Sequence, residues 1–285
     1  MPALSLLQET KNTLAGLGIR PQKRRGQNFM IDRATLVFIS ELAALGNPGA
    51  VLEIGPGLGF LTRELLLKNL KVTALEKDRV LAGHLSGIFS QTALEILEAD
   101  VLKIALKKDL GVHEPLQVVA NIPYNITSPI LEWLILQRSL VSRAILTVQW
   151  EVALRLNALP GTKEWGALSI FVQTYAAVRL ARKIPRNSFF PAPKVDSAVV
   201  ELVFSKEPRF DIQDETLFFK TVRRAFQKRR KTALNALLDE KDPIFSKANL
   251  TRAFSHSNLD AARRSETFSI PEWARIVRTV YAITK

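Results

Sequence analysis

A glycine-rich turn and two acidic residues form the first candidate binding site in the sequence. The segment Glu53-Ile-Gly-Pro-Gly-Leu-Gly59 follows a short apolar run and precedes a helix expected to begin near Phe60. Glycines there permit a tight turn and let the backbone approach a ligand closely, with helix N–H groups nearby. Glu76 follows Gly55 by 21 positions, where a carboxylate can accept both hydroxyls of a ribose. Asp100 ends the third apolar run and places another acid at the same predicted edge.

The spacing of the glycines bears on the kind of ligand. Gly55, Gly57 and Gly59 are closer together than in the dehydrogenase fingerprint, whose third glycine comes three residues after the second. This disfavours a dinucleotide such as NAD. S-adenosylmethionine needs no diphosphate cradle, because it carries an adenosine and a methionine tail. An alternative at this point is that the turn merely ends a strand and that Glu76 and Asp100 cap helices.

The sequence Asn121-Ile122-Pro123-Tyr124 provides a second candidate site, with chemistry suited to an aromatic amine. The N6 amine of adenine is a poor nucleophile because its lone pair is delocalised into the ring. The side-chain oxygen of Asn121 and the backbone carbonyl of Ile122 could accept the two amine hydrogens and favour a pyramidal nitrogen, while Tyr124 stacks on the base. Positioning and charge placement would then supply most of the catalysis, and no strong general base is required.

These residues need a scaffold that brings the ends of several strands together. Short β-branched runs alternate with helical stretches, which predicts crossover units in a mostly parallel sheet with helices on both faces, an α/β fold. Open sheets of this kind bind ligands at the carboxyl ends of their strands. The expected strands are Val51–Ile54, Val72–Leu75, Leu94–Leu97, Leu116–Ala120 and Ala144–Val148.

The two ends of the chain differ from this central pattern. Beyond Ser205 the sequence becomes helical, basic and poor in strands, so a domain boundary is expected near residue 205. Before it, Val178–Ile184 and Val195–Phe204 suit an antiparallel hairpin that closes the sheet edge. N-terminal to the sheet we expect a helix over Leu4–Leu14, a basic loop over Pro21–Asn28 and a helix that runs from an N-cap at Asp32 to Leu45.

Composition indicates a partner rich in phosphate. The chain has 40 Lys and Arg against 27 Asp and Glu, a net charge of +13. The segment Lys220–Lys231 holds seven basic residues and no acid, and Arg20–Arg25 is also basic. With no cysteine and only isolated histidines we expect no metal site. No apolar run approaches the ~20 residues of a membrane span and no secretory signal is visible, so a cytoplasmic protein without membrane contact is expected.

In their order and spacing these motifs resemble the ribosomal RNA adenine dimethyltransferase family, over nearly the whole chain. That family comprises a bacterial enzyme acting on the small subunit and its eukaryotic and mitochondrial relatives. One departure is Arg24-Arg25 before Gly26, where relatives often place an aromatic residue. The matching segments are Arg25-Gly-Gln-Asn28-Phe-Met30, Glu53 to Gly59, Glu76, Asp100, Asn121 to Tyr124, Phe189-Phe-Pro-Ala-Pro-Lys-Val-Asp-Ser197 and Phe226-Gln-Lys-Arg-Arg-Lys-Thr232.

The resemblance implies a role for each matching residue in binding S-adenosylmethionine. Asn28 and Met30 would flank the methionine portion, and Gly55 would lie against the cofactor. Glu76 would hold the ribose, and Asp100 would bind the adenine amine of the cofactor.

The resemblance also implies a site for the target base. Asn121 would lie between the methyl donor and that base, in a catalytic motif that includes Pro123. Phe189 would supply a second stacking ring opposite Tyr124, and two rings that sandwich an extruded base are a known way of holding one nucleotide for chemistry. Alternatively, Phe189 and its neighbour Phe190 are core aromatics.

As a whole, the resemblance implies a Rossmann-like methyltransferase domain over residues 1–205 and a small helical RNA-contacting domain over 206–285. The expected activity is dimethylation of two adjacent adenosines near the 3′ end of small-subunit ribosomal RNA, by a monomer acting on the immature small subunit. Three alternatives remain: a large-subunit adenine methyltransferase of the antibiotic-resistance type, a non-catalytic assembly factor or nucleic-acid-binding module on the same fold, and, more distantly, a DNA adenine methyltransferase.

Overall fold

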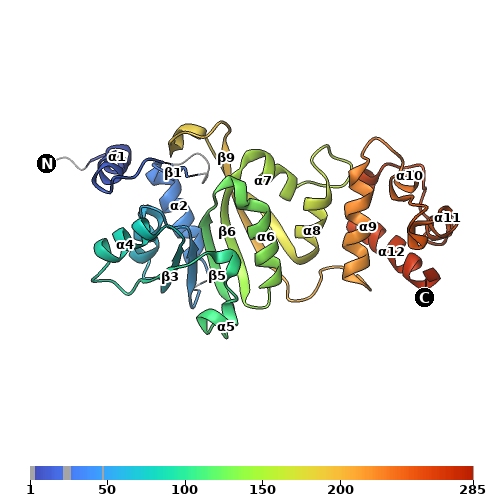
Figure 1. Ribbon diagram of the computed structural model, residues 1–285, viewed down its shortest axis with the longest axis horizontal. Helices are drawn as coiled ribbons and strands as arrows, with labels where there is room; N and C mark the ends of the chain where they lie inside the picture. The colour runs from blue at the N-terminus through green and yellow to red at the C-terminus, as the bar shows by residue number, and fades with distance from the viewer. Residues whose placement is uncertain (1–3, 22–26, 47, 285) are drawn as a thin grey trace. The chain divides into compact units, whose positions relative to one another are not determined.

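The computed structural model of the chain describes residues 4–21, 27–46 and 48–284, so the basic residues Lys23 to Arg25 lie outside the described part. A seven-stranded sheet has the order β4-β3-β2-β5-β6-β9-β7 (Figure 1). Its strands are β2 (Val51–Ile54), β3 (Val72–Glu76), β4 (Glu95–Glu98), β5 (Leu116–Asn121), β6 (Val141–Gln149), β7 (Ala176–Ile184) and β9 (Ser197–Phe204). The pairs from β4 to β6 are all parallel, as expected from the alternation of strands and helices.

The sheet order places a crevice where the sequence analysis expected ligands. β2 is bordered by β3 on one side and by β5 on the other, so successive connections leave in opposite directions from the middle of the sheet. Such a switch point opens a crevice beyond the carboxyl ends of the strands. Ile54, Glu76, Glu98 and Asn121 are the last residues of β2 to β5.

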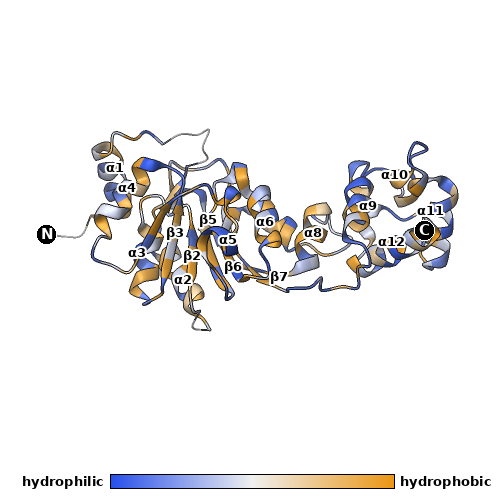
Figure 2. Ribbon diagram, turned by 60° about the horizontal axis from the view of Figure 1, so that its bottom comes forward, coloured by the Kyte–Doolittle hydropathy of each residue, from blue (hydrophilic) through white to orange (hydrophobic). Residues whose placement is uncertain are grey.

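Helices cover the sheet because its strands are apolar on both faces. Val119, Ile145 and Val199 share a core cluster with residues of α2 and α3, whereas Val118 and Leu146, one position along their strands, are also fully buried. Figure 2 shows the central strands largely in the colour of apolar residues. The helices in this part are α1 (Leu6–Gly16), α2 (Arg33–Ala44), α3 (Phe60–Leu67), α4 (Arg79–Ile88), α5 (Leu106–Leu110) and α6 (Thr127–Leu136).

Two pairings near the sheet edge involve segments far apart in sequence. β9 runs antiparallel to β6 and neighbours β7, which is the edge strand, as the predicted sheet-closing role requires. A separate two-stranded sheet pairs β1 (Phe29–Met30) with β8 (Phe189–Phe190), with Met30 opposite Phe189. This pairing was not predicted. The N-cap of α2 was predicted correctly, because the Asp32 side chain accepts the Ala34 N–H at 3.1 Å.

Contacts divide the chain into two compact units. Unit 1 consists of residues 1–153 and 177–204, and unit 2 of residues 154–176 and 205–285. The last change of unit, between residues 204 and 205, coincides with the boundary expected near residue 205, but the segment 154–176 groups with the C-terminal helices and not with the sheet. The remaining helices are α7 (Trp150–Leu156), α8 (Ala167–Tyr175), α9 (Glu215–Gln227), α10 (Ala233–Leu237), α11 (Lys247–His256) and α12 (Ile270–Thr284).

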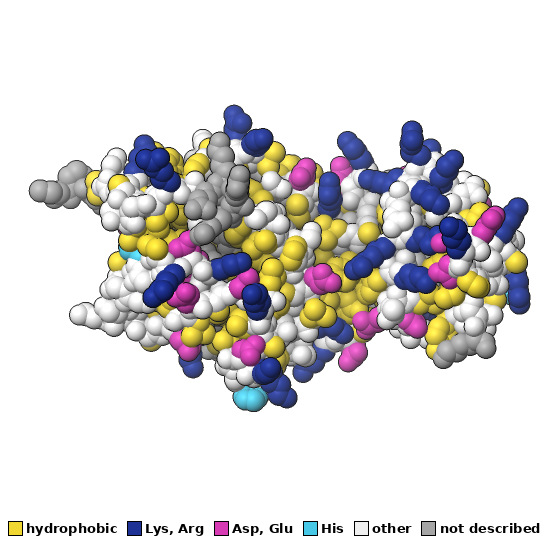
Figure 3. Space-filling model, in the orientation of Figure 1, with side chains coloured by type: hydrophobic (Ala, Val, Ile, Leu, Met, Phe, Trp, Pro, Cys, Tyr) yellow, Lys and Arg dark blue, Asp and Glu magenta, His cyan; other side chains and the backbone are white. Residues whose placement is uncertain are grey.

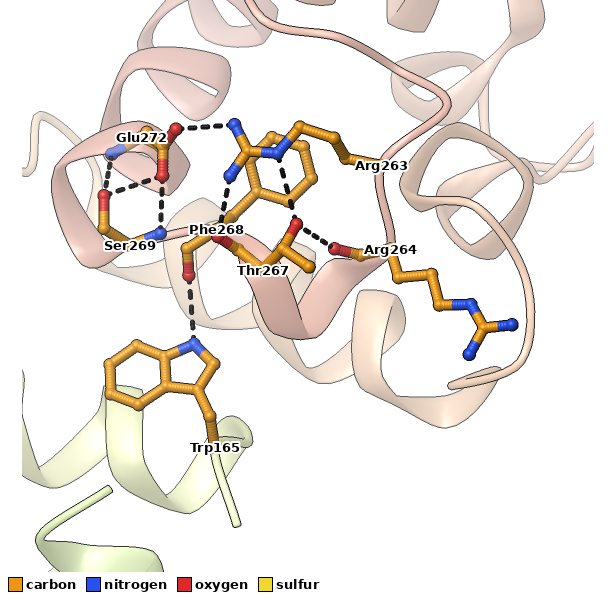
Figure 4. A network of polar contacts seen from close by, with 7 residues as sticks. All are labelled: Trp165, Arg263, Arg264, Thr267, Phe268, Ser269 and Glu272. Carbon is orange, nitrogen blue, oxygen red and sulfur yellow. Dashed lines mark hydrogen bonds and ion pairs between the residues drawn. The ribbon is translucent and has the colours of Figure 1, made fainter. Parts of the chain in front are cut away.

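Unit 2 has a core of its own, in which Trp165 and Ile170 pack with C-terminal residues such as Phe218 and Trp273. The Trp165 indole donates to the Phe268 carbonyl at 3.0 Å. Figure 4 shows the polar network around that residue: the Arg263 guanidinium lies 4.1 Å from the Phe268 ring centroid and pairs with Glu272 at 2.7 Å. These contacts fix the segment that leads into α12. Among the described residues no helix has the length and apolar character of a membrane-spanning segment.

Candidate functional site

A cavity of about 400 Å³ lies in unit 1 at the carboxyl edge of the sheet. Its wall combines the glycine turn, the acids at the ends of β3 and β4, and the residues that follow β5. The structure therefore brings together most of the residues singled out from the sequence. Those that line the cavity are Asn28, Met30, Gly55, Glu76, Asp100, Asn121, Pro123 and Tyr124, with Phe29, Glu53, Gly57, Phe60, Lys77 and Ile122 among their neighbours.

The glycine turn brings bare backbone to the cavity. Gly55 has φ of +66°, a conformation that side-chain-bearing residues rarely adopt, and no atom lies within 4 Å of the position a Cβ would occupy. At Gly59, the N-cap of α3, φ is +80° and a Cβ would approach the Phe89 ring to 2.7 Å. One glycine thus keeps space for a ligand open, and the other lets α3 pack against α4.

Glu76 lies where the sequence analysis placed it and has an additional structural role. Its carboxylate accepts the Gly57 N–H at 3.1 Å and the Asp78 N–H at 2.9 Å, one on each oxygen. Burial raises the pKa of Glu76, and these two backbone hydrogen bonds oppose the shift. A carboxylate offers about four acceptor sites, so each oxygen retains capacity for a ligand hydroxyl. Glu76 therefore supports the glycine turn as well as facing the cavity.

Asp100 caps a short helix, as the alternative interpretation of the sequence had it, and it also lines the cavity. One oxygen caps the short helix Val101–Lys103 by accepting the Leu102 N–H at 3.2 Å, and the other lies 2.8 Å from Lys77 Nζ. The hydrogen bond from Lys77 holds the pKa of Asp100 below its ordinary value. The Asp100 carboxylate is consequently ionised at neutral pH, and an exposed lysine is its present partner.

Glu53 is a cavity residue to which the sequence analysis assigned no role. It is 1% exposed, and the Thr62 hydroxyl donates to it at 2.6 Å. Burial raises the pKa of Glu53 to about 8, with a smaller contribution from the nearby charge of Glu76. Its side chain is therefore mostly protonated at neutral pH. The sequence feature that could have identified Glu53 is its position in the strand directly before the glycine turn.

Asn121 ends β5 beside the cavity, and its side chain is oriented by Asn28, which precedes β1. Its Nδ2 donates to the Asn28 backbone carbonyl at 3.1 Å, which leaves Oδ1 as the acceptor of that amide. The next residue, Ile122, donates its N–H to Thr147 on β6, and none of the described residues donates to the Ile122 carbonyl. Two acceptors, a side-chain oxygen and a backbone oxygen, therefore follow one another where β5 ends.

Tyr124 is held by a residue that lies far from it in the sequence. It begins the short helix Tyr124–Ile126 directly after Pro123, and its phenol oxygen lies 2.5 Å from Ser197 Oγ on β9. Burial raises the pKa of Tyr124, so the phenol stays neutral. Ser197 is fully buried and ends the motif that begins at Phe189. The hydrogen bond joins two motifs that are far apart in the sequence.

Phe189 is buried in the core of unit 1. Its ring is 2% exposed, belongs to the core cluster of α2 and α3, and is not among the residues lining the cavity. Phe190 is only partly buried, with Lys11 Nζ 5.7 Å from its ring centroid. Phe189 pairs with Met30 and its ring is in the core, so a stacking role for Phe189 stays a prediction. A stacking role would require the ring to leave the core.

The basic segment Lys220–Lys231 is also arranged differently from the prediction. Lys220 pairs with Asp242 at 2.7 Å, and Arg224 pairs with Asp239 at 2.5 Å while donating to the Leu237 carbonyl. Arg223 and Lys231 are exposed, and Lys231 lies beyond the end of α9. Lys220 and Arg224 thus hold α9 against α10 and the loop after it, whereas Arg223 and Lys231 face solvent. Ala225 is buried in the core of unit 2, and Phe226 is partly buried against it.

A parallel sheet with a glycine turn at its switch point, followed by a carboxylate at the end of the next strand, defines a Rossmann-like methyltransferase domain that uses S-adenosylmethionine. The chain belongs to the ribosomal RNA adenine dimethylase family, whose model matches residues 19–280. The expected fold class and family are confirmed.

Relatives match this chain over nearly its full length. The ribosomal RNA small subunit methyltransferase A of Moorella thermoacetica is 40% identical over 272 residues, 92% of this chain and 93% of the relative. The protein of the same description from Clostridioides difficile is 38% identical, with 96% of each chain covered. Among solved structures, a dimethyladenosine transferase from Plasmodium falciparum has a TM-score of 0.72 at 26% identity, over 87% of this chain and 95% of that one. The 23S rRNA methyltransferase ErmE has a TM-score of 0.68 at 29% identity, over 89% of this chain and 100% of that one.

Proposed function

We propose that this protein uses S-adenosylmethionine to dimethylate the N6 amines of two adjacent adenosines near the 3′ end of small-subunit ribosomal RNA, acting as a cytoplasmic monomer on the immature subunit. The observation that carries the proposal is the Asn121 amide, fixed by the Asn28 carbonyl at 3.1 Å, with the carbonyl of Ile122 beside it. These two acceptors stand at a cavity that also presents Glu76 and Asp100.

The residues of the cavity suit S-adenosylmethionine. Gly55 keeps open backbone at the turn, and Glu76 retains acceptor sites for two ribose hydroxyls. Asp100 is ionised and can accept from the adenine amine, while Asn28 and Met30 provide the wall for the methionine portion. When bound, S-adenosylmethionine supplies a methyl group activated by its positively charged sulfur.

The protein's contribution at the target base is orientation. Asn121 Oδ1 and the Ile122 carbonyl accept the two amine hydrogens, which localises the nitrogen lone pair and directs it along one line. Pro123 sets the backbone so that Tyr124 follows directly, and the neutral Tyr124 ring, anchored through its hydroxyl on Ser197, offers a face for stacking. The amine proton becomes acidic as the new bond forms, so it can leave to water.

The choice of small-subunit RNA rests on the relatives. Those at 36–40% identity carry the name small subunit methyltransferase, and this chain covers 93–99% of their lengths. The likeness to the 23S rRNA methyltransferase ErmE favours a second candidate, methylation of a large-subunit adenine. The same site chemistry would serve both reactions, so the two candidates are distinguished by which ribosomal RNA the protein modifies.

Unit 2 is proposed to dock on ribosomal RNA. Figure 3 shows Lys and Arg side chains gathered over α9 to α11. Arg223, Lys228, Arg230 and Lys231 are exposed, and within the described chain none of them has an ion-pair partner. Solvent-exposed cations of this kind are suited to contacting phosphate.

The test is to incubate the protein with S-adenosylmethionine and small ribosomal subunits from a strain that lacks the relative of this enzyme, and to map dimethyladenosine by mass spectrometry. Two dimethylated adjacent adenosines near the 3′ end are expected, and Asn121→Ala should abolish them while binding to the particle remains. Modification of large-subunit RNA alone would support the second candidate. A protein that binds the particle and S-adenosylmethionine but transfers no methyl group would be an assembly factor.

A further inference from the structure

One of the four tryptophans differs from the others in exposure. Trp133, Trp165 and Trp273 are at most 6% exposed and belong to the interior of their units. Trp150, the first residue of α7, is partly exposed. Its indole N–H has no hydrogen-bond acceptor among the described residues. A partly exposed tryptophan ring offers an apolar face and a polar N–H to a ligand.

A lysine is fixed over this ring. Lys183 Nζ on β7 lies 4.9 Å from the centroid of the Trp150 ring and 3.1 Å from an Asp196 carboxylate oxygen. Asp196 also accepts the Arg186 N–H at 3.1 Å, and its backbone carbonyl accepts the Trp150 N–H at 2.9 Å. The hydrogen bond from Lys183 holds the pKa of Asp196 below its ordinary value, so this carboxylate remains ionised at neutral pH. Asp196 therefore holds an exposed cation and an aromatic ring together.

This cluster is connected to the proposed target-base site. Trp150 directly follows Gln149, whose partner across the β6–β9 ladder is Ser197. Ser197 is the residue that holds the Tyr124 hydroxyl at 2.5 Å. Opposed residues in an antiparallel ladder have Cα atoms about 4.5–5.5 Å apart, so Ser197 links the segment that carries Trp150 to the Tyr124 side chain.

The surrounding charge suits RNA. Arg186 and Lys194 are exposed in the loop that joins β7 to β9, on either side of β8. An aromatic ring next to cations is the arrangement by which proteins hold single-stranded nucleic acid, because a base stacks on the ring and its phosphate contacts the cation.

We propose that Trp150 and Lys183 form a second nucleotide subsite, in which the indole stacks on a base that neighbours the target adenosine in single-stranded RNA and Lys183 contacts its phosphate. This inference rests on the proposed function and adds to it a fixed place for a flanking nucleotide. A methyltransferase that modifies two adjacent adenosines requires each in turn at Tyr124, and a flanking subsite would hold the strand while it is repositioned.

The subsite can be tested by fluorescence, because Trp150 is the partly exposed tryptophan. A single-stranded RNA oligonucleotide with the sequence around the modified adenosines should quench the wild-type emission, and Trp150→Phe should remove that quenching. Loss of a stacked base should weaken binding of this oligonucleotide by about tenfold in Trp150→Leu and by less in Trp150→Phe, which keeps a ring. Lys183→Gln should weaken binding only slightly and mainly at low salt, because the ion pair with Asp196 already offsets part of the Lys183 charge.

Lys68→Gln is the matched control, since Lys68 is in an ion pair with Glu41 on a different surface of unit 1 and should behave as wild type. Each variant is also titrated with S-adenosylmethionine, whose affinity should be unchanged. Wild-type affinity and methylation rate in Trp150→Leu, or quenching that persists in Trp150→Phe, would overturn the subsite while leaving the proposed function intact. If the wild-type protein methylates no small-subunit adenosine, the proposed function fails, and the quenching measurement still decides whether this ring binds RNA.

Discussion

The phenol oxygen of Tyr124 lies 2.5 Å from the hydroxyl oxygen of Ser197, so the ring proposed to stack on the target base is fixed by a residue of β9, two strands away from β5 in the sheet. Ser197 is fully buried on β9, and β9 is held along its length by β6. The position of Tyr124 is therefore coupled to the sheet and does not depend on the short helix Tyr124–Ile126 alone.

Ser197→Ala is expected to lower the rate of methyl transfer by roughly two- to tenfold, the effect of losing one hydrogen bond that orients a ring. Tyr124→Phe removes the same hydrogen bond from the other side and should have a similar effect. The double variant should be no slower than either single variant, because one interaction is lost in all three. Single-turnover rates measure this, and additive losses would show that the two hydroxyls act independently.

Glu76→Ala is expected to weaken S-adenosylmethionine binding, since a charged acceptor of two ribose hydroxyls is lost at a cost of about 1.5–3 kcal/mol. The variant should also be less stable without ligand, because the N–H groups of Gly57 and Asp78 lose their acceptor. Calorimetric titration and thermal unfolding of the same sample separate the two effects. Unchanged affinity in the folded variant would remove Glu76 from the cofactor site.

Substitutions of Asp100 and Lys77 are expected to change S-adenosylmethionine affinity in different directions. Asp100→Ala should weaken S-adenosylmethionine binding, although less than Glu76→Ala, since water can replace a partly exposed acceptor. Lys77→Met should leave affinity equal or improve it, because the lysine now occupies the Asp100 oxygen at 2.8 Å. A loss of affinity in Lys77→Met as large as in Asp100→Ala would mean that their ion pair itself builds the site.

The buried Glu53 predicts a pH dependence of stability. Its pKa is raised from 4.5 to about 8 by burial, so the folded state retains a proton that the unfolded state releases. This contribution is fully present below pH 4.5 and is lost as the pH rises to about 8. For one proton the slope is about 1.4 kcal/mol per pH unit in this range. The free energy of unfolding can be measured with urea at chosen pH values from about 5 to about 9. It should decline less steeply with pH for Glu53→Gln than for wild type. Equal slopes would show that Glu53 does not titrate this way.

The central sheet was predictable because each of its strands is encoded locally. Runs such as Val51–Ile54 and Val72–Glu76 are short, apolar and bounded by turn residues, so periodicity and punctuation suffice. The cavity residues Gly55, Glu76 and Asn121 were predictable for the same reason, since the carboxyl ends of parallel strands must meet at one edge.

Long-range pairings were not predictable in this way. The strands β1 and β8 have two residues each and no periodicity, so their pairing, which buries Phe189, had no local signal. Residues 154–176 contain an apolar helix whose packing partners in unit 2 come after residue 205, and a sequence pattern cannot name the partner. Likewise, charge density alone does not reveal that Lys220 and Arg224 are paired with Asp242 and Asp239.

This division of the basic segment yields a controlled test of RNA docking. Arg223 and Lys231 face solvent, so replacing both by Gln should weaken binding to small ribosomal particles. It should also flatten the dependence of log affinity on log salt by about one to two units, if both contact phosphate.

The control is the double variant Lys220→Gln and Arg224→Gln, which removes the same formal charge from the same basic segment. Those cations are neutralised by Asp242 and Asp239, so the control should lose stability in thermal unfolding and change the salt slope less. S-adenosylmethionine affinity should be unchanged in both, because the cofactor residues are in unit 1. Equal salt slopes for both double variants would mean that net charge alone matters. An unaltered slope in the folded variant of Arg223 and Lys231 would assign this segment to a solvated surface, and the docking cations would then have to be sought among Arg182, Arg186 and Lys194.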